Sequence, residues 1–160
     1  MIPWFVNSLS GAARRRVASD RWGVSAAWRV GNPAGRFFLA ASLQNACRHH
    51  AVWGLEAART GAFTPPALVG PVPFGDLQGM MEKAQRAPEA FEPHEVNGWA
   101  GRHLDLHIGP RKLAFTSETF ILSFSMPNFC FHVVTAYDIL RMRGVPIGKR
   151  DYEGRLRTRS

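Results

Sequence analysis

The chain has 160 residues, 46% of them hydrophobic and 20% charged, which is the balance of one globular domain and excludes a mainly disordered protein. The formal net charge is +8, but the basic residues gather in two places, residues 12–36 and residues 149–160. Nucleic-acid binding surfaces usually spread basic residues along one face among aromatic side chains. The clumped charge therefore argues against a nucleic-acid partner.

Two further classes of protein are disfavoured by the sequence. No run approaches the roughly 18 apolar residues that span a bilayer, and residues 1–9 lack the basic start of a signal peptide. The two cysteines, Cys47 and Cys130, are far apart, so free buried thiols in a reducing compartment are favoured over a disulfide. We therefore predict a cytoplasmic protein without a membrane partner.

The first clear element in chain order is a helix over residues 37–58. It follows residues 31–35 (Gly-Asn-Pro-Ala-Gly), which are typical of a turn, and its apolar residues recur at spacings of three and four. Four prolines predict an extended connection over residues 62–74. Asp76 is then predicted to cap a helix that ends at Arg86, because a carboxylate can accept hydrogen bonds from first-turn amides.

A short β-hairpin is predicted next. Residues 103–108 alternate between polar and apolar, and Gly109-Pro110 turns the chain back. His103, Asp105 and His107 share one face of the first strand, since alternate residues point the same way. They could ligate a metal together, but an exposed polar face of a hairpin is the favoured explanation.

The last predicted element is a long apolar helix over residues 120–142. Thr116 or Ser117 is expected to cap it, and Pro127 is expected to bend it or split it in two. The helical repeat places small and polar residues along one stripe, which suits a polar pocket inside a bundle. The stripe consists of Ile121, Ser125, Asn128, His132, Ala136 and Ile139.

The last helix and its tail also carry a family resemblance. Residues 125–152 read SMPNFCFHVVTAYDILRMRGVPIGKRDY, which strongly resembles the C-terminal signature of domain-of-unknown-function family 1993 (DUF1993). Residues 43–50 (LQNACRHH) and the hairpin also look like that family. The resemblance implies a mainly α fold, a DinB-like four-helix bundle with a small β-hairpin before the last helix. We expect one such domain over residues 1–154, followed by a basic tail over 155–160.

The resemblance also implies a metal site. In the metal-binding DinB-like members, three histidines from different helices face a central pocket. His132 resembles the ligand of the last helix, and either His49 or His50 could stand where an earlier helix provides one. Zinc, nickel or manganese would be the ion. Many members carry a second histidine where this chain has Asn128, whose neutral amide oxygen is a poor ligand for zinc or nickel.

Each of these histidines also has a purely structural interpretation. A buried His132 could bond Asn128 or a backbone carbonyl. His49 and His50 are adjacent, so in an α-helix they point about 100° apart and only one can face the core. The other signature residues are expected to support the pocket, with Asp138 pairing with Arg141, Tyr137 anchored in the core and residues 148–152 folding back as a clasp. They are Thr135, Tyr137, Asp138, Arg141, Lys149, Asp151 and Tyr152.

Residues 12–36 depart from the family pattern. Where the family carries a long helix, this chain has an arginine clump followed by Gly-Asn-Pro-Ala-Gly, and our hypothesis is a local frameshift or a mispredicted gene model. Two interpretations stay open. In the first, the protein is a DinB-like bundle, expected to form a homodimer, without a complete set of catalytic residues. In the second, it is a divergent metal-dependent enzyme that uses His132 with His49 or His50 as ligands. The sequence does not identify a small-molecule ligand.

Overall fold

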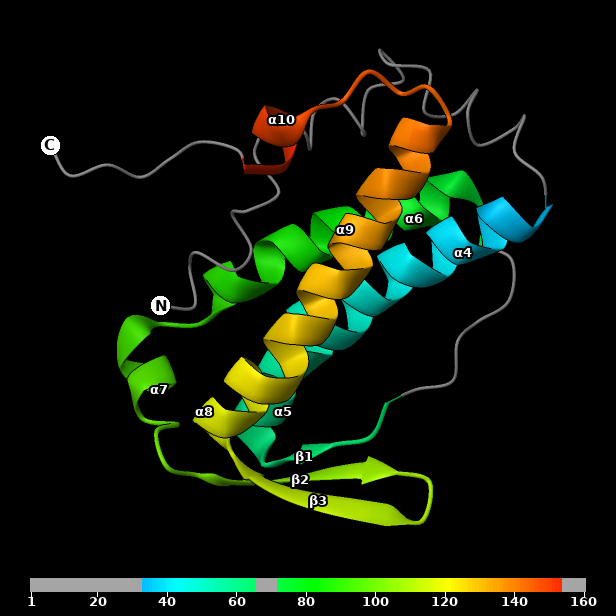
Figure 1. The fold of residues 1–160 in the computed structure, drawn as a ribbon. Coiled ribbons are helices and arrows are strands. Elements are labelled where there is room, and N and C mark those ends of the chain that lie inside the picture. The colour runs from blue at the N-terminus through cyan, green and yellow to red at the C-terminus, as the bar shows by residue number, and fades with distance from the viewer. Residues whose placement is uncertain (1–32, 66–71, 154–160) are drawn as a thin grey trace, which may run out of the picture.

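The computed structural model describes residues 33–65 and 72–153. Figure 1 shows long helical rods side by side, with a small sheet at one end, which confirms the mainly α prediction. Three expectations fall wholly or mostly outside the described residues: the fourth helix that the family resemblance implies, the frameshift proposed over residues 12–36, and the basic tail. The first rod comprises α4 (Pro33–Gln44), the π-helical segment η2 (Asn45–Val52) and α5 (Trp53–Thr60). The second rod is α6 (Phe74–Arg86). The third rod comprises α8 (Ser117–Phe120), the π-helical segment η4 (Ile121–Ser125) and α9 (Met126–Met142).

The first rod begins earlier than the sequence predicts. Pro33 starts α4, so the predicted turn over residues 31–35 is wrong from Pro33 onward. Proline suits the first helical position because its fixed φ is helical and its missing N–H would be unsatisfied there anyway. The rod ends at Thr60, two residues beyond the predicted end, and Gly61 follows it in the left-handed conformation with φ 85°.

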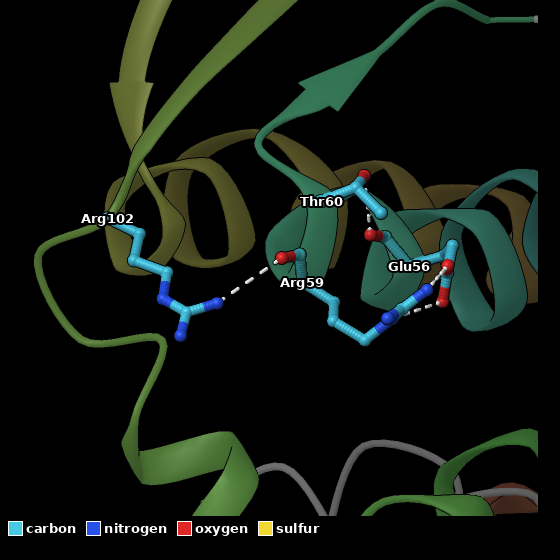
Figure 2. A network of polar contacts seen from close by, with 4 residues as sticks. All are labelled: Glu56, Arg59, Thr60 and Arg102. Atoms are coloured by element: carbon cyan, nitrogen blue, oxygen red, sulfur yellow. Dashed lines mark hydrogen bonds and ion pairs between the residues drawn. The ribbon is translucent and has the colours of Figure 1, made fainter.

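Polar contacts fix the C-terminal end of α5 (Figure 2). Arg59 forms an ion pair with Glu56 one turn earlier, and the Thr60 hydroxyl donates to the Glu56 carbonyl at 2.9 Å. Arg102, which precedes the hairpin, donates to the carbonyl of Arg59 at 3.5 Å. A cation near the last carbonyls of a helix also interacts favourably with its dipole. These contacts link the first rod to the chain entering the sheet.

The start of α6 differs from the prediction. Pro73, not Asp76, is the N-cap residue, and its carbonyl accepts from the amides of Asp76 and Leu77. Asp76 lies inside the first turn, where its charge still faces the positive end of the helix dipole. Two short helices that the sequence did not predict follow before the sheet, the 3-10 helix η3 (Ala87–Ala90) and α7 (Pro93–Asn97).

The hairpin is confirmed and gains a third strand. Strands β2 (His103–Ile108) and β3 (Arg111–Thr116) pair antiparallel, and β1 (Ala62–Phe63) pairs parallel with the other edge of β2. The apolar face of the sheet covers the end of the bundle, where α5 and α8 meet it. The buried cluster there is Ala57, Phe63, Leu104, Leu106 and Phe120.

The third rod begins with the predicted cap. Thr116 forms a capping box with Thr119, in which each hydroxyl accepts a hydrogen bond from the backbone amide of the other residue. Pro127 neither splits nor ends the rod, and the π-helical η4 ends two residues before it, at Ser125. A wider turn there relieves the clash between a proline ring and the carbonyl four residues earlier. After Gly144, with φ 80°, the chain turns back into α10 (Lys149–Glu153).

Contrary to the sequence-based expectation that no segment is apolar enough to span a bilayer, one helix among the described residues, Ser117–Met142, is long and apolar enough to cross a membrane by length and composition alone. The central helix of a helical bundle meets the same criterion. This helix packs along α4 and η2 in the bundle (Figure 1).

Candidate functional site

His49 and His50 both lie in the core, which corrects the prediction that only one of them faces inward. Each is 5% exposed. They belong to η2, where the backbone is π-helical rather than α-helical. A π-helix has a wider turn, so successive side chains are separated by a smaller rotation than the 100° of an α-helix. Two adjacent imidazoles can therefore share one inward face.

His132 on α9 meets this pair from the opposite rod. Its ring lies almost parallel to that of His50, with 6.2 Å between ring centroids and 17° between planes. Nδ1 of His132 is buried and has no hydrogen-bond partner. The predicted bond to Asn128 is absent, because the Asn128 amide donates to the Phe124 carbonyl at 2.7 Å. An unpaired buried polar atom costs about 1–3 kcal/mol, so this nitrogen is available for a ligand.

Ser125 completes the inner face of the cluster. It is 3% exposed, it ends the π-helical η4, and its Oγ lies 3.4 Å from Nδ1 of His50. Gly54 lies directly opposite, where an added Cβ would come within 2.6 Å of that Oγ. Both rods thus use a π-helical segment at the level of the cluster, and such segments frequently mark functional sites.

Burial keeps these imidazoles neutral. Removal from water, followed by the charge of Arg48, lowers the pKa of His49 to about 4. Removal from water and then the neighbouring His132 lower the pKa of His50 to about 4, and burial also lowers the pKa of His132. At neutral pH all three rings therefore carry a nitrogen lone pair, which is the form that binds metals.

The donor chemistry fits zinc or nickel better than manganese, since imidazole suits the former and carboxylate the latter. Two imidazoles bound to one tetrahedral ion at about 2.1 Å place their centroids about 5 Å apart. The His50–His132 and His49–His50 centroid distances are 6.2 and 6.5 Å. Across residues 33–65 and 72–153, no three His, Cys, Asp or Glu side chains are close enough to hold an ion. Convergence on one ion therefore requires the side chains to rotate inward.

The polar face of the hairpin is occupied by contacts to Asp105. Asp105 lies 2.9 Å from Nε2 of His103 and 2.7 Å from Nζ of Lys112 across the hairpin. His107 is exposed and contributes to neither pair. With its carboxylate engaged by a lysine, Asp105 is poorly placed to bind a metal, and the exposed polar face accounts for these residues.

The C-terminal signature residues form the clasp that the sequence predicts. The Tyr152 ring packs edge-on against Tyr137 of α9, with centroids 5.9 Å apart. Asp151 accepts from the amide of Gly148 at 2.9 Å, which closes the turn before α10. Lys149 pairs with Glu153 at the surface, 3.0 Å apart. Of these contacts, the one between Tyr152 and Tyr137 joins the tail to the bundle, whereas the other two lie within the tail.

Two other expectations on α9 are corrected. Arg141 does not pair with Asp138; it donates to the Tyr137 hydroxyl at 3.4 Å and lies over the Tyr137 ring. Tyr137 is only partly buried rather than anchored in the core. The Thr135 hydroxyl donates to the Phe131 carbonyl, so it serves the helix backbone. Cys130 is a free, half-buried thiol, and the side chain of Cys47 lies outside the described part of the structure.

The contact between Gly54 and Ser125 yields a testable expectation. Alanine normally stabilises a helix interior by about 1 kcal/mol relative to glycine, but here its methyl group would meet the Ser125 hydroxyl. We expect Gly54→Ala to be less favourable in the wild-type background than in Ser125→Ala by about 1–3 kcal/mol. Urea denaturation of the four proteins of this double-mutant cycle measures the difference. Additive effects would show that the two residues are not in contact.

Comparisons with known proteins agree with this architecture. Residues 39–153 match the family described as "Domain of unknown function (DUF1993)". The fold is similar to the crystal structure of a DinB family member protein from Shewanella denitrificans, with a TM-score of 0.72 and 20% sequence identity over 100% of this chain and 93% of that one. No curated protein matches the sequence. The chain belongs to the DUF1993 family and has a DinB-like fold.

Proposed function

We propose that this DUF1993 protein binds a divalent transition-metal ion, zinc or nickel, at its histidine cluster, with His50 and His132 as the main ligands and His49 beside them. The observation that carries the proposal is the buried, unpartnered Nδ1 of His132 next to a nearly parallel His50 ring. Such an ion would supply Lewis-acid character beside the buried rings of His49 and His50.

The same cluster offers little for catalysis by itself. Burial, Arg48 and the other imidazoles account for the lowered pKa values, and no carboxylate is among the groups that shift them. A general acid or base that works near neutral pH needs a pKa close to it, whereas His49 and His50 have pKa values of about 4. We therefore propose that the cluster binds a metal ion within the helical bundle, and we do not propose a complete catalytic site.

The spacing predicts modest affinity. Stable zinc sites usually use three or four protein ligands held in place before the ion arrives, and here the rings must first approach one another. The free energy needed for that rearrangement offsets part of the binding free energy, so the affinity is expected to fall below that of a preformed site. Tight binding would then depend on the rings of His50 and His132 moving toward that of His49.

Metal titration tests the proposal. We expect the protein purified without chelators to bind about one zinc or nickel ion per chain, and His132→Ala to weaken the affinity at least tenfold. His107→Ala is the matched control, because His107 is exposed on the hairpin and should leave binding unchanged. Elemental analysis gives the stoichiometry and calorimetry the affinity. Absence of binding, or equal losses in both variants, would refute the proposal.

A further inference from the structure

Asn45 holds His49 by a hydrogen bond whose direction the structure determines. The Asn45 side-chain amide donates from Nδ2 to the carbonyl of Ala41 at 2.8 Å. A carbonyl only accepts, so the nitrogen of the amide must face Ala41 and its oxygen must face the other way. That oxygen, Oδ1, lies 2.9 Å from Nδ1 of His49.

The proton on His49 follows from this arrangement. Oδ1 of Asn45 can only accept, so Nδ1 of His49 must donate and carries the proton. In a neutral imidazole the other nitrogen, Nε2, then has the lone pair. A histidine without such a partner in water favours the opposite tautomer, with the proton on Nε2.

The ring of His49 is held on its face as well as at its edge. It stacks on Trp53 one turn later, with centroids 5.7 Å apart and planes 12° apart. The Arg48 guanidinium lies over the same Trp53 ring, 4.9 Å from its centroid. Because Asn45 and Trp53 lie four residues before and after His49, the ring has a hydrogen bond on one side and a stacking partner on the other.

We propose that Asn45 is a positioning residue, which fixes His49 as the Nδ1–H tautomer so that its Nε2 lone pair is free for a divalent metal ion. The metal part of this inference rests on the proposed function; the tautomer part does not. A partner that orients the second nitrogen of a ligating histidine raises its basicity, and losing it typically costs 10–100-fold in affinity.

The tautomer is measured on the metal-free protein by long-range ¹H–¹⁵N correlation spectra of ¹⁵N-histidine-labelled chains, with His49→Gln identifying the signals. We expect His49 to carry its proton on Nδ1 in the wild type and to shift toward the Nε2–H form in Asn45→Leu. Asn45→Asp keeps an acceptor and should retain the Nδ1–H form. Asn128→Leu is the matched control, since Asn128 makes the same bond to a carbonyl four residues earlier but reaches no imidazole.

Zinc titration of the same variants gives the second result. Affinity is expected to fall 10–100-fold in Asn45→Leu and to recover in Asn45→Asp, with thermal melting confirming that both variants fold. An Nε2–H ring in the wild type, or a tautomer indifferent to Asn45→Leu, overturns the inference. If the wild type shows the Nδ1–H ring but binds neither zinc nor nickel, the proposed function fails while the control of the tautomer by Asn45 stands.

Discussion

Metal-free protein is expected to lose about 2–4 kcal/mol of folding stability between pH 7.5 and pH 5. His49 and His50 have pKa values of about 4 in the folded protein, against 6.5 in the unfolded chain. Below pH 6.5 the unfolded state therefore binds protons that the folded state excludes, so stability is complete above pH 6.5 and is lost as the pH falls toward 4. At pH 5 this linkage amounts to about 2 kcal/mol for each histidine.

Urea denaturation at several pH values measures this loss. The range above pH 5 is chosen because the carboxylates whose pKa values are lowered by their partners, such as Glu118, remain ionised there. His50→Gln removes one titrating ring and should remove about half of the loss, whereas His107→Gln, at an exposed position, should leave it intact. If His50→Gln changes the midpoint but not its pH dependence, the buried ring does not titrate as expected.

Much of the third rod and the sheet was predictable because their signals are local. Period-two alternation specifies β2 without reference to the rest of the chain, and Thr116 can cap a helix from its own side chain. Strand β1 was missed for the opposite reason. It has only two residues, and its pairing with β2 depends on a distant segment that supplies the partner backbone.

The candidate site was predicted in its residues but not in its geometry. The helical stripe and the family resemblance both singled out His132, and the structure places it against His50. That His49 is buried as well follows from the π-helical η2, which no spacing rule for α-helices anticipates. Asn45, four residues before His49, could have been recognised from its spacing, because helical neighbours at that interval meet.

Gly54 shows a different limit of sequence reasoning. A glycine inside a helical pattern lowers local helix propensity, so from the sequence alone it only weakens the prediction. The reason for glycine at this position lies on the opposite rod, in the Ser125 hydroxyl that a methyl group would meet. The close approach of the two rods at the histidine cluster therefore depends on a pair of residues 71 positions apart.

Phe120→Ala is expected to cause the largest single loss of stability, about 3–5 kcal/mol. Phe120 has no exposed surface, and its ring contacts those of Phe63, Phe115 and Phe124 at centroid distances of 5.5, 6.0 and 5.4 Å. Removing it leaves a cavity where the sheet packs against the bundle, and the short strands cannot collapse into it without breaking their pairing. Urea or thermal denaturation measures the loss. A loss below about 1 kcal/mol would contradict the packing of the sheet on the rods.

Phe131→Ala is the matched truncation on the same rod. Phe131 is 65% exposed, so the same chemical change removes little buried area and should cost less than about 1 kcal/mol. The contrast matters beyond stability, because the outer face of α9 also exposes Val134 and Met142. If Phe131→Ala costs as much as Phe120→Ala, and the cost shrinks as the protein is diluted, then a second copy of the chain covers this face in solution.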